Sequence, residues 1–250
     1  RISRVRKVMA PKNGYEDWEI TQMLSNALGY PMNYKHASEI MDEVAQLTPT
    51  FKGVSYEKLD KLESIQWPCN DEFPEGTPTM HVDEFVRGKG KFFITEYVPT
   101  VEKVNGKFPL IMTTGRILAH YNVGAQTRRT KNSEWHDEDL IEIHPHDAEE
   151  RGINERDWVG INSRSGDTVL RAKITDRVQP GVVYTTFHHP VSGANVITTD
   201  NSDWATNCPE FKVTAVQVTK VTQPSNWQSK YQKFSEKQID FVKNGEEKVS

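Results

Sequence analysis

Cysteine is scarce in this sequence of 250 residues. The two cysteines, Cys69 and Cys208, lie far apart, and no pair has the spacing of a zinc or iron–sulfur site. Two lone thiols fit a reducing compartment and favour a cytoplasmic location, while a single disulfide between them is also compatible with the sequence. The sequence therefore predicts no metal bound through cysteine.

Long apolar runs and a strong charge excess are also missing. No stretch is long enough to cross a bilayer, so we expect no membrane span. The formal net charge of -4 gives no electrostatic reason to expect nucleic acid as a partner. The sequence begins at Arg1 without Met or signal-peptide features and reads like the interior of a longer polypeptide, so we expect a preceding segment. P-loop, Gly-x-Gly-x-x-Gly, His-Glu-x-x-His and Ser-His-Asp patterns are absent.

The first third of the chain has helical periodicity. Apolar positions over residues 18–28 follow helical spacing, with Asp17 as the expected N-cap and Gly29 as the stop. Ser38 is the expected cap of a second helix, and Ser55 begins a short third one. Residues 67–106 are rich in Pro and Gly, which predicts an extended connection containing one short strand at 92–98.

The pattern after residue 107 is mainly β. Short apolar runs predict six strands, at residues 109–113, 140–144, 158–162, 168–174, 182–186 and 213–218. A short helix is expected at 145–151, with His144 and His146 as residues of its first turn and not ligands. Six short strands with few helical turns indicate a small closed barrel. The remaining polar tail, residues 223–250, is expected to wrap the surface or to be mobile.

The first segment with chemical potential is Thr113-Thr114-Gly115-Arg116, at the end of a predicted strand. Gly115 lets the backbone approach a ligand, and the planar guanidinium of Arg116 matches a phosphate. Thr127 and Arg128, followed by a second arginine, supply another polar cluster. These residues suit a pyrophosphate; the alternative is a tight turn with solvated arginines.

The second segment is Phe187-His188-His189-Pro190, after another strand. Adjacent histidines point apart in an extended chain, so metal binding is disfavoured and a polar ligand contact is the better interpretation.

The third segment runs from Gly193 to Lys212. The amide of Asn195 can donate and accept hydrogen bonds, as a heterocycle requires, and Lys212 supplies a point charge at a strand start. The alternative is ordinary loop capping by Asn and Thr.

Together these segments resemble a known family. TTGRILAHYNVGAQTRR, IEIHPHDAEERGI, FHHP, ANVITTD and CPEFK occur in the order found in the dinucleotide-binding C-terminal domain of molybdopterin oxidoreductases. The stretches TPTFKGVSYEKLD, WPCNDEFPEGTPTMHVDEFVRGKGKF and DNSDWATNCPEFKVTAVQV make the resemblance closest to the catalytic (alpha) subunit of cytosolic, NAD-linked formate dehydrogenases. The match covers nearly the whole chain except the last few tens of residues.

The resemblance implies a mixed α/β fold. Residues 1–66 correspond to the helical end of a preceding α/β cofactor-binding domain, and residues 67–106 to an extended connection. Residues 107–222 correspond to a double-psi β-barrel that binds the dinucleotide, and residues 223–250 to a polar tail.

It also implies a cofactor, namely bis-molybdopterin guanine dinucleotide carrying molybdenum or tungsten. The positions that match cofactor contacts are Thr114, Gly115, Arg116, His120, Tyr121, Asn122, Thr127, Arg128, His188, Asn195 and Lys212. Phe187 matches a position near the substrate funnel. The family's metal-ligating Cys or selenocysteine, catalytic His and Arg, and iron–sulfur cysteines lie upstream and have no counterpart here, so we expect no catalytic residue, no metal ligand and no activity in this chain alone.

The implied reaction is oxidation of formate to carbon dioxide, reversible in some members. The expected partners are the remainder of the catalytic subunit and an NAD-reducing subunit with iron–sulfur clusters and FMN. Two alternatives stay open: the corresponding part of another molybdopterin oxidoreductase such as nitrate reductase, and a non-catalytic cofactor-binding module. The stretch 67–91 favours formate dehydrogenase, and retention of Thr114-Gly115-Arg116, Asn195 and Lys212 argues against loss of the cofactor.

Overall fold

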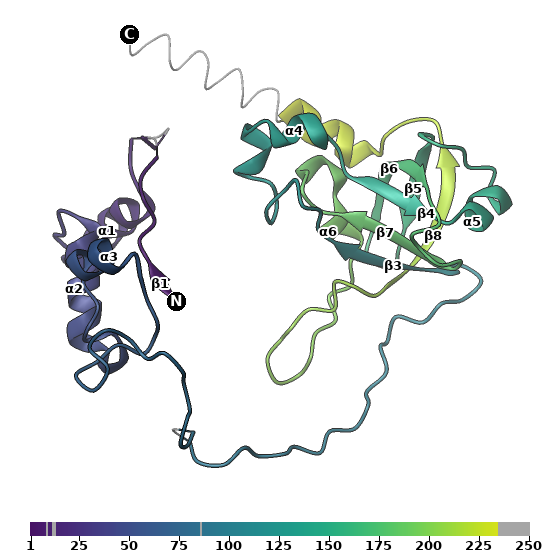
Figure 1. The fold of residues 1–250 in the computed structure, drawn as a ribbon. Coiled ribbons are helices and arrows are strands. Elements are labelled where there is room, and N and C mark those ends of the chain that lie inside the picture. Colours follow the sequence, from purple (N-terminus) through teal and green to yellow (C-terminus); the bar gives the residue numbers. More distant parts are fainter. Residues whose placement is uncertain (9, 12–13, 86, 235–250) are drawn as a thin grey trace, which may run out of the picture. The chain divides into compact units, whose positions relative to one another are not determined.

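The computed structural model describes residues 1–8, 10–11, 14–85 and 87–234. The chain divides into two compact units, Arg1–Thr95 and Glu96–Ser250 (Figure 1). Residues 235–250 of the expected polar tail lie outside the described residues. No described helix is long and apolar enough to cross a membrane. Both cysteines are free thiols, Cys69 buried and Cys208 exposed.

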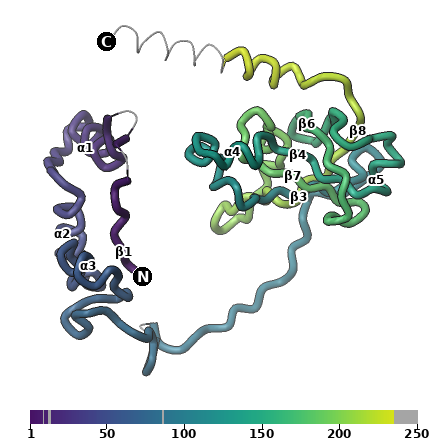
Figure 2. Tube along the Cα trace, turned by 45° about the horizontal axis from the view of Figure 1, so that its top comes forward, coloured from purple at the N-terminus to yellow at the C-terminus, as the bar shows by residue number. Residues whose placement is uncertain are grey.

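The first unit is a small helical body. Figure 2 traces its helices and its first strand. Its elements are β1 (Ile2–Ser3), α1 (Asp17–Ala27), α2 (Ala37–Leu47), the 3-10 turn η1 (Pro49–Phe51), α3 (Tyr56–Leu62) and β2 (Ser64–Ile65). β1 pairs antiparallel with β2. The core of this unit is a small cluster of buried residues, Val54, Leu59, Ile65 and Cys69.

Two of the three expected helix caps in this unit differ from the structure. Ser55 caps α3 as predicted, since its side chain accepts the Lys58 N–H at 3.1 Å. Asp17 is not the cap of α1 but its first residue, because Glu19 reaches back to the N–H of Glu16 at 2.7 Å and moves the start one residue earlier.

The expected cap of α2 is also misplaced. The helix begins at Ala37, with His36 as its N-cap. The imidazole Nδ1 of His36 accepts the N–H of Ser38 at 3.1 Å, so His36 fills the acceptor role that was assigned to the serine.

The predicted short strand at 92–98 is wrong. Residues 87–109 form neither helix nor strand. Phe92 and Ile94 are each 100% exposed, and no neighbouring strand within the described chain pairs with this segment. A β-favouring composition is insufficient when no partner strand is within reach.

The second unit is a closed six-stranded barrel, which confirms the predicted fold class. Its strands are β3 (Leu110–Gly115), β4 (Leu140–Ile143), β5 (Trp158–Asn162), β6 (Asp167–Ile174), β7 (Val182–Thr186) and β8 (Thr214–Val221). Around the barrel the order is β3-β7-β4-β6-β5-β8. The pairs β3/β7 and β4/β6 are parallel, and the other four pairs are antiparallel. Buried Met112, Ile141, Val159, Val183 and Val216 belong to its core.

Short helical turns connect the strands. They are η2 (Thr127–Arg129), α4 (Asn132–Trp135), α5 (Pro145–Glu150), η3 (Pro190–Ser192) and α6 (Ala194–Ile197). As predicted, His144 and His146 belong to the first turn of α5: the His144 ring accepts the His146 N–H at 3.2 Å.

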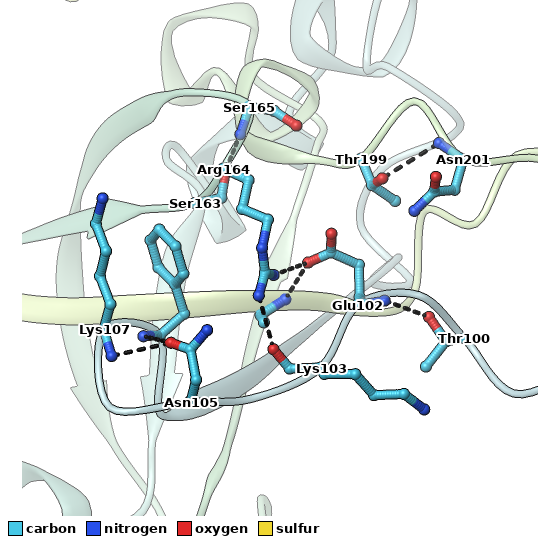
Figure 3. Close-up of polar contacts among 12 residues, drawn as sticks. Thr100, Glu102, Lys103, Asn105, Lys107, Ser163, Arg164, Ser165, Thr199 and Asn201 are labelled. Atoms are coloured by element: carbon cyan, nitrogen blue, oxygen red, sulfur yellow. Dashed lines mark hydrogen bonds and ion pairs between the residues drawn. The ribbon is translucent and has the colours of Figure 1, made fainter.

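A buried carboxylate fastens the segment before β3 to the barrel. Glu102 is 6% exposed, and its Oε2 accepts hydrogen bonds from Arg164 Nη1 at 3.0 Å and from the Ala215 N–H at 2.8 Å. Arg164 Nη2 also donates to the Lys103 carbonyl at 2.8 Å (Figure 3). Segment 102–103 is therefore held against the β5–β6 turn and β8.

The described start of the C-terminal tail also packs on the barrel. Residues 226–234 are helical. Gln228 is 5% exposed and exchanges two hydrogen bonds with the backbone of Val169, at 3.2 and 2.8 Å. Its Nε2 also donates to the Val191 carbonyl at 3.0 Å, so one side chain joins the tail to β6 and η3.

Candidate cofactor-binding site

The parallel pairing of β3 and β7 brings two predicted segments together. Gly115 is paired in register with Thr186, so the residues that follow both strands emerge at the same edge of the barrel. The guanidinium carbon of Arg116 lies 5.8 Å from the ring centroid of Phe187. Two sequence motifs that are about seventy positions apart thus form one surface.

Gly115 lies close to the side chain of Tyr184. A Cβ on residue 115 would lie 2.7 Å from the Tyr184 ring, closer than packed atoms approach. The Tyr184 hydroxyl donates to the Arg116 carbonyl at 3.2 Å, which fixes the chain as it leaves β3. Burial raises the pKa of Tyr184, so its hydroxyl stays a donor.

Thr114 brings the third predicted segment to the same place. The Thr114 hydroxyl donates to the Phe211 carbonyl at 2.9 Å. Lys212 therefore follows directly after a residue that is fastened to β3, and it is exposed. This arrangement adds a second cation near the end of that strand.

His188 lies beneath the loop that follows β3. It is fully buried. Its Nε2 accepts the Ile117 N–H at 3.1 Å, and its Nδ1 lies 2.5 Å from the Asn122 carbonyl. Because a carbonyl only accepts, Nδ1 carries the proton and the ring is neutral. Burial lowers the pKa of His188, which favours the same neutral form.

His188 was expected to contact the cofactor. Here both of its ring nitrogens bind the backbone of the loop, so the ring fastens the loop from below. Asn122 contributes through its carbonyl and its left-handed backbone, with φ of 48°.

The other half of the loop is held by His120. This ring is 5% exposed, and its Nε2 donates to the His136 carbonyl at 2.7 Å. Its Nδ1 therefore accepts from the Thr127 hydroxyl at 3.0 Å. That hydroxyl oxygen in turn accepts the N–H of Tyr121, whose side chain is exposed, at 3.2 Å. His120 and Thr127 thus act on the shape of the loop.

Arg128 is tightly placed and unpaired. A Cβ at Gly124, whose φ is +71°, would lie 2.6 Å from the His188 carbonyl oxygen and 3.0 Å from Arg128 Cγ and Nε. The Nε atom of Arg128 is buried and has no hydrogen-bond partner. A buried donor without a partner is unusual and points to a missing acceptor.

One expected residue belongs neither to the loop after β3 nor to the end of β7. Asn195 belongs to α6, and its side chain is exposed. Within the described chain no recorded contact joins its amide to the loop after β3. The sequence alone does not show where Asn195 lies relative to that loop.

Asp139 is a site residue that sequence reasoning missed. It is 3% exposed and precedes β4. Its carboxylate accepts hydrogen bonds from the Thr186 hydroxyl and from the N–H groups of His188 and His189. In the sequence it ends the run Asp137-Glu138-Asp139, which is indistinguishable from a solvated charged stretch.

The residues present fit an anionic dinucleotide. Within the described chain, the side chains of Arg116, Arg128 and Lys212 make no hydrogen bond and no ion pair. Unpaired cations beside a backbone kept bare by Gly115 offer donors to phosphate oxygens. In the described part of the chain, no group of three or more His, Cys, Asp or Glu residues could hold a metal ion.

Comparisons with known proteins found a matching family model and several similar proteins. Residues 110–215 match the family model described as "Molydopterin dinucleotide binding domain". The chain is 39% identical over 227 residues to the F420-dependent formate dehydrogenase subunit alpha of Methanocaldococcus jannaschii, covering 88% of this chain and 34% of that protein. It is 32% identical over 224 residues to formate dehydrogenase H of Escherichia coli, covering 87% of this chain and 31% of that protein. The chain thus spans about a third of the length of these curated relatives.

A solved structure has the same fold. Acetylene hydratase from Pelobacter acetylenicus matches with a TM-score of 0.56 and 13% identity, over 83% of this chain and 33% of that chain. At this identity the likeness concerns the fold alone. Three of the similar formate dehydrogenase alpha subunits are named as F420-dependent, so the NAD-linked specificity expected from the sequence is not confirmed.

Proposed function

We propose that this chain, in which residues 110–215 match the molybdopterin dinucleotide-binding domain and which is similar to formate dehydrogenase alpha subunits, forms one wall of the cofactor site of a formate dehydrogenase. The observation that carries the proposal is the group of unpaired cations, Arg116, Arg128 and Lys212, around the ends of β3 and β7.

Arg116 and Arg128 bind phosphate oxygens of the dinucleotide, and the buried Nε of Arg128 finds its acceptor there. Lys212 adds a positive charge at the end of β3. Thr114, Gly115, His120, Asn122 and Thr127 shape the backbone that faces the cofactor, while Tyr121 and Asn195 supply exposed polar groups. Phe187 lies beside Arg116, and in this proposal it lines the substrate funnel.

The bound cofactor, bis-molybdopterin guanine dinucleotide with molybdenum or tungsten, supplies the metal that takes the electrons of formate. The reaction converts formate to carbon dioxide, one proton and two electrons, and it is reversible in principle. The remainder of the catalytic subunit supplies the metal ligand and the proton-transfer residues. The electrons pass through iron–sulfur clusters and FMN of a partner subunit to NAD, in a cytoplasmic complex. In this proposal residues 1–66 are the end of a preceding domain, and residues 67–106 are an extended connection. Residues 107–222 are the dinucleotide-binding barrel, and residues 223–250 are a polar tail.

Native purification tests this proposal. The purified protein should contain molybdenum or tungsten and release guanine nucleotide on denaturation, at about two nucleotides per metal. It should reduce NAD with formate, and the 250-residue chain alone should show no turnover. If formate reduces F420 and not NAD, the electron acceptor in this proposal is wrong, but the assignment of the molybdopterin cofactor still holds. Absence of guanine nucleotide in protein that has kept its metal would refute the assignment.

Nitrate offered as an oxidant is the control for substrate class. Nitrate reduction without formate oxidation would favour the nitrate reductase alternative. Bound dinucleotide without either activity in the native complex would favour a non-catalytic cofactor-binding module.

A further inference from the structure

Asp139 occupies an unusual position in the barrel. It lies one residue before β4, yet its carboxylate points to the end of β7 and binds three donors there. One oxygen, Oδ1, accepts the Thr186 hydroxyl and the His188 N–H at 3.2 Å. The other, Oδ2, accepts the His189 N–H at 2.8 Å. The carboxylate therefore fixes three of the four residues 186–189 where β7 ends.

The carboxylate keeps its charge although it is buried. Burial acts to raise the pKa of Asp139, but hydrogen bonds from His189 and Thr186 outweigh it and lower the pKa to about 2. The His189 Nδ1 atom lies 3.3 Å from Oδ1. At neutral pH a negative charge is thus held beneath the loop that follows β3.

Through His188 this charge reaches the loop. The backbone N–H of His188 is held by Asp139, and the ring of the same residue binds Ile117 and Asn122. Any movement of the His188 backbone therefore moves both attachment points of the loop.

Four histidines lie together near the carboxylate, which also has Glu138, Arg171 and Tyr184 in its surroundings. The His120 ring centroid lies 5.5 Å from that of His188, 5.2 Å from that of His189 and 6.3 Å from that of His136. These three neighbours and His120 come from the loop after β3, the segment before β4 and the end of β7. The carboxylate of Asp139 accepts the backbone N–H groups of two of these histidines, His188 and His189.

We propose that Asp139 is a positioning residue for cofactor binding: acting through the backbone and ring of His188, it holds the loop of residues 116–128 in the shape that places Arg116 and Arg128 against the dinucleotide. This inference rests on the proposed function and deepens it. The carboxylate of Asp139 is occupied by donors of the protein, so its effect is on the order of the loop.

The barrel offers a matched control in Asp147. This residue is 4% exposed, its Oδ2 accepts the Gly181 N–H at 2.8 Å, and its Oδ1 lies 3.7 Å from Arg151. It is a buried carboxylate that fastens backbone, like Asp139, but its recorded contacts do not include residues 116–128. Asp139→Asn and Asp147→Asn both exchange one oxygen for an amide of the same size.

The test is hydrogen exchange, read by mass spectrometry on peptides of the natively purified protein after removal of the cofactor. In Asp139→Asn an amide faces one of the N–H donors, so exchange over 116–128 should be roughly ten- to hundred-fold faster than in wild type. Peptides from β5 and β6 should not change. In Asp147→Asn the faster exchange should be confined to the chain around Gly181.

Guanine nucleotide content is the second measurement, made on protein purified with its cofactor. Asp139→Asn should retain less than a tenth of the wild-type nucleotide, and Asp147→Asn should retain all of it. Unchanged exchange over 116–128 in Asp139→Asn would overturn the inference, as would equal exchange or nucleotide loss in both variants. Faster exchange with full nucleotide content would also overturn it.

Two further outcomes, misfolding of the variant and failure of the proposed function, can be told apart. If Asp139→Asn does not fold, Thr186→Val removes a single donor to the carboxylate and should give the same pattern, at roughly three- to ten-fold; no change there overturns the inference. Wild-type protein that never contains guanine nucleotide would refute the proposed function itself, whatever the exchange pattern.

Discussion

Replacing Gly124 by alanine should disturb the cofactor loop in a measurable way. The residue has φ of +71°, and an added Cβ would lie 2.6 Å from the His188 carbonyl oxygen, which is backbone and cannot swing aside. The left-handed conformation alone costs about 1–2 kcal/mol for a residue with a Cβ. Displacing the close neighbour adds about 1–3 kcal/mol, as overpacking in a fitted interior does.

Gly152 provides the matched control. Its φ is +62°, and a Cβ there would meet nothing within 4 Å. Gly152→Ala should therefore carry only the cost of the left-handed backbone. The difference in stability between the two variants then measures the cost of the close contact between residue 124 and the His188 carbonyl. At about 2–4 °C per kcal/mol for a chain of this size, the collision should lower the melting temperature of Gly124→Ala by about 2–12 °C beyond that of Gly152→Ala.

Thermal unfolding of both variants, followed by Trp fluorescence, measures this difference. Guanine nucleotide content should fall in Gly124→Ala and stay at the wild-type level in Gly152→Ala. Equal melting temperatures together with equal nucleotide content would show that the loop does not depend on the close approach of residues 124 and 188.

Three other changes test other contacts. Arg116→Ala should weaken cofactor retention roughly ten- to hundred-fold, about 1.5–3 kcal/mol, and Arg116→Lys should restore it only in part because it lacks the planar fork; nucleotide content after prolonged dialysis measures both. Gln228→Ala leaves the N–H and carbonyl of Val169 without their partner and should lower the free energy of unfolding by about 1–3 kcal/mol, with unchanged stability counting against the bridge. Acidification should lower the stability of the folded chain in two stages, which a pH series of melting temperatures would show. Because the pKa of His188 is lowered in the folded state, the unfolded chain takes up a proton first, and stability falls as the pH drops below about 6.5. Asp139, whose pKa is lowered to about 2, adds a second loss of stability between about pH 4 and 2.

Much of the barrel could be predicted because its strands are short apolar runs that end at turn residues. β4, β5 and β7 begin and end within one residue of the predicted bounds. The helix caps were less predictable, because His36 and Glu16 cap through geometry that composition does not encode.

The candidate site was predictable in its exposed cations and in Gly115, whose positions after strand ends follow from the pattern. The roles of the buried polar groups were not. Asp139 and Gln228 have the composition of surface residues, and only the fold shows that each is buried and bound to backbone. His188 was expected at the ligand, but its ring lies beneath the loop, since the turn after β7 directs it inward.

The order of strands around the barrel has a consequence for synthesis of the protein. Of the six neighbouring pairs, only β5 and β6 are consecutive in the chain, and β8 closes the barrel between β5 and β3. β3 leaves the ribosome first but finds its two partners, β7 and β8, among the last strands made. The contacts of His120 with Thr127 and His136 can form early, but the His188 attachment of the loop after β3 forms only once residue 188 has emerged. We therefore expect loading of the dinucleotide to follow translation of β7.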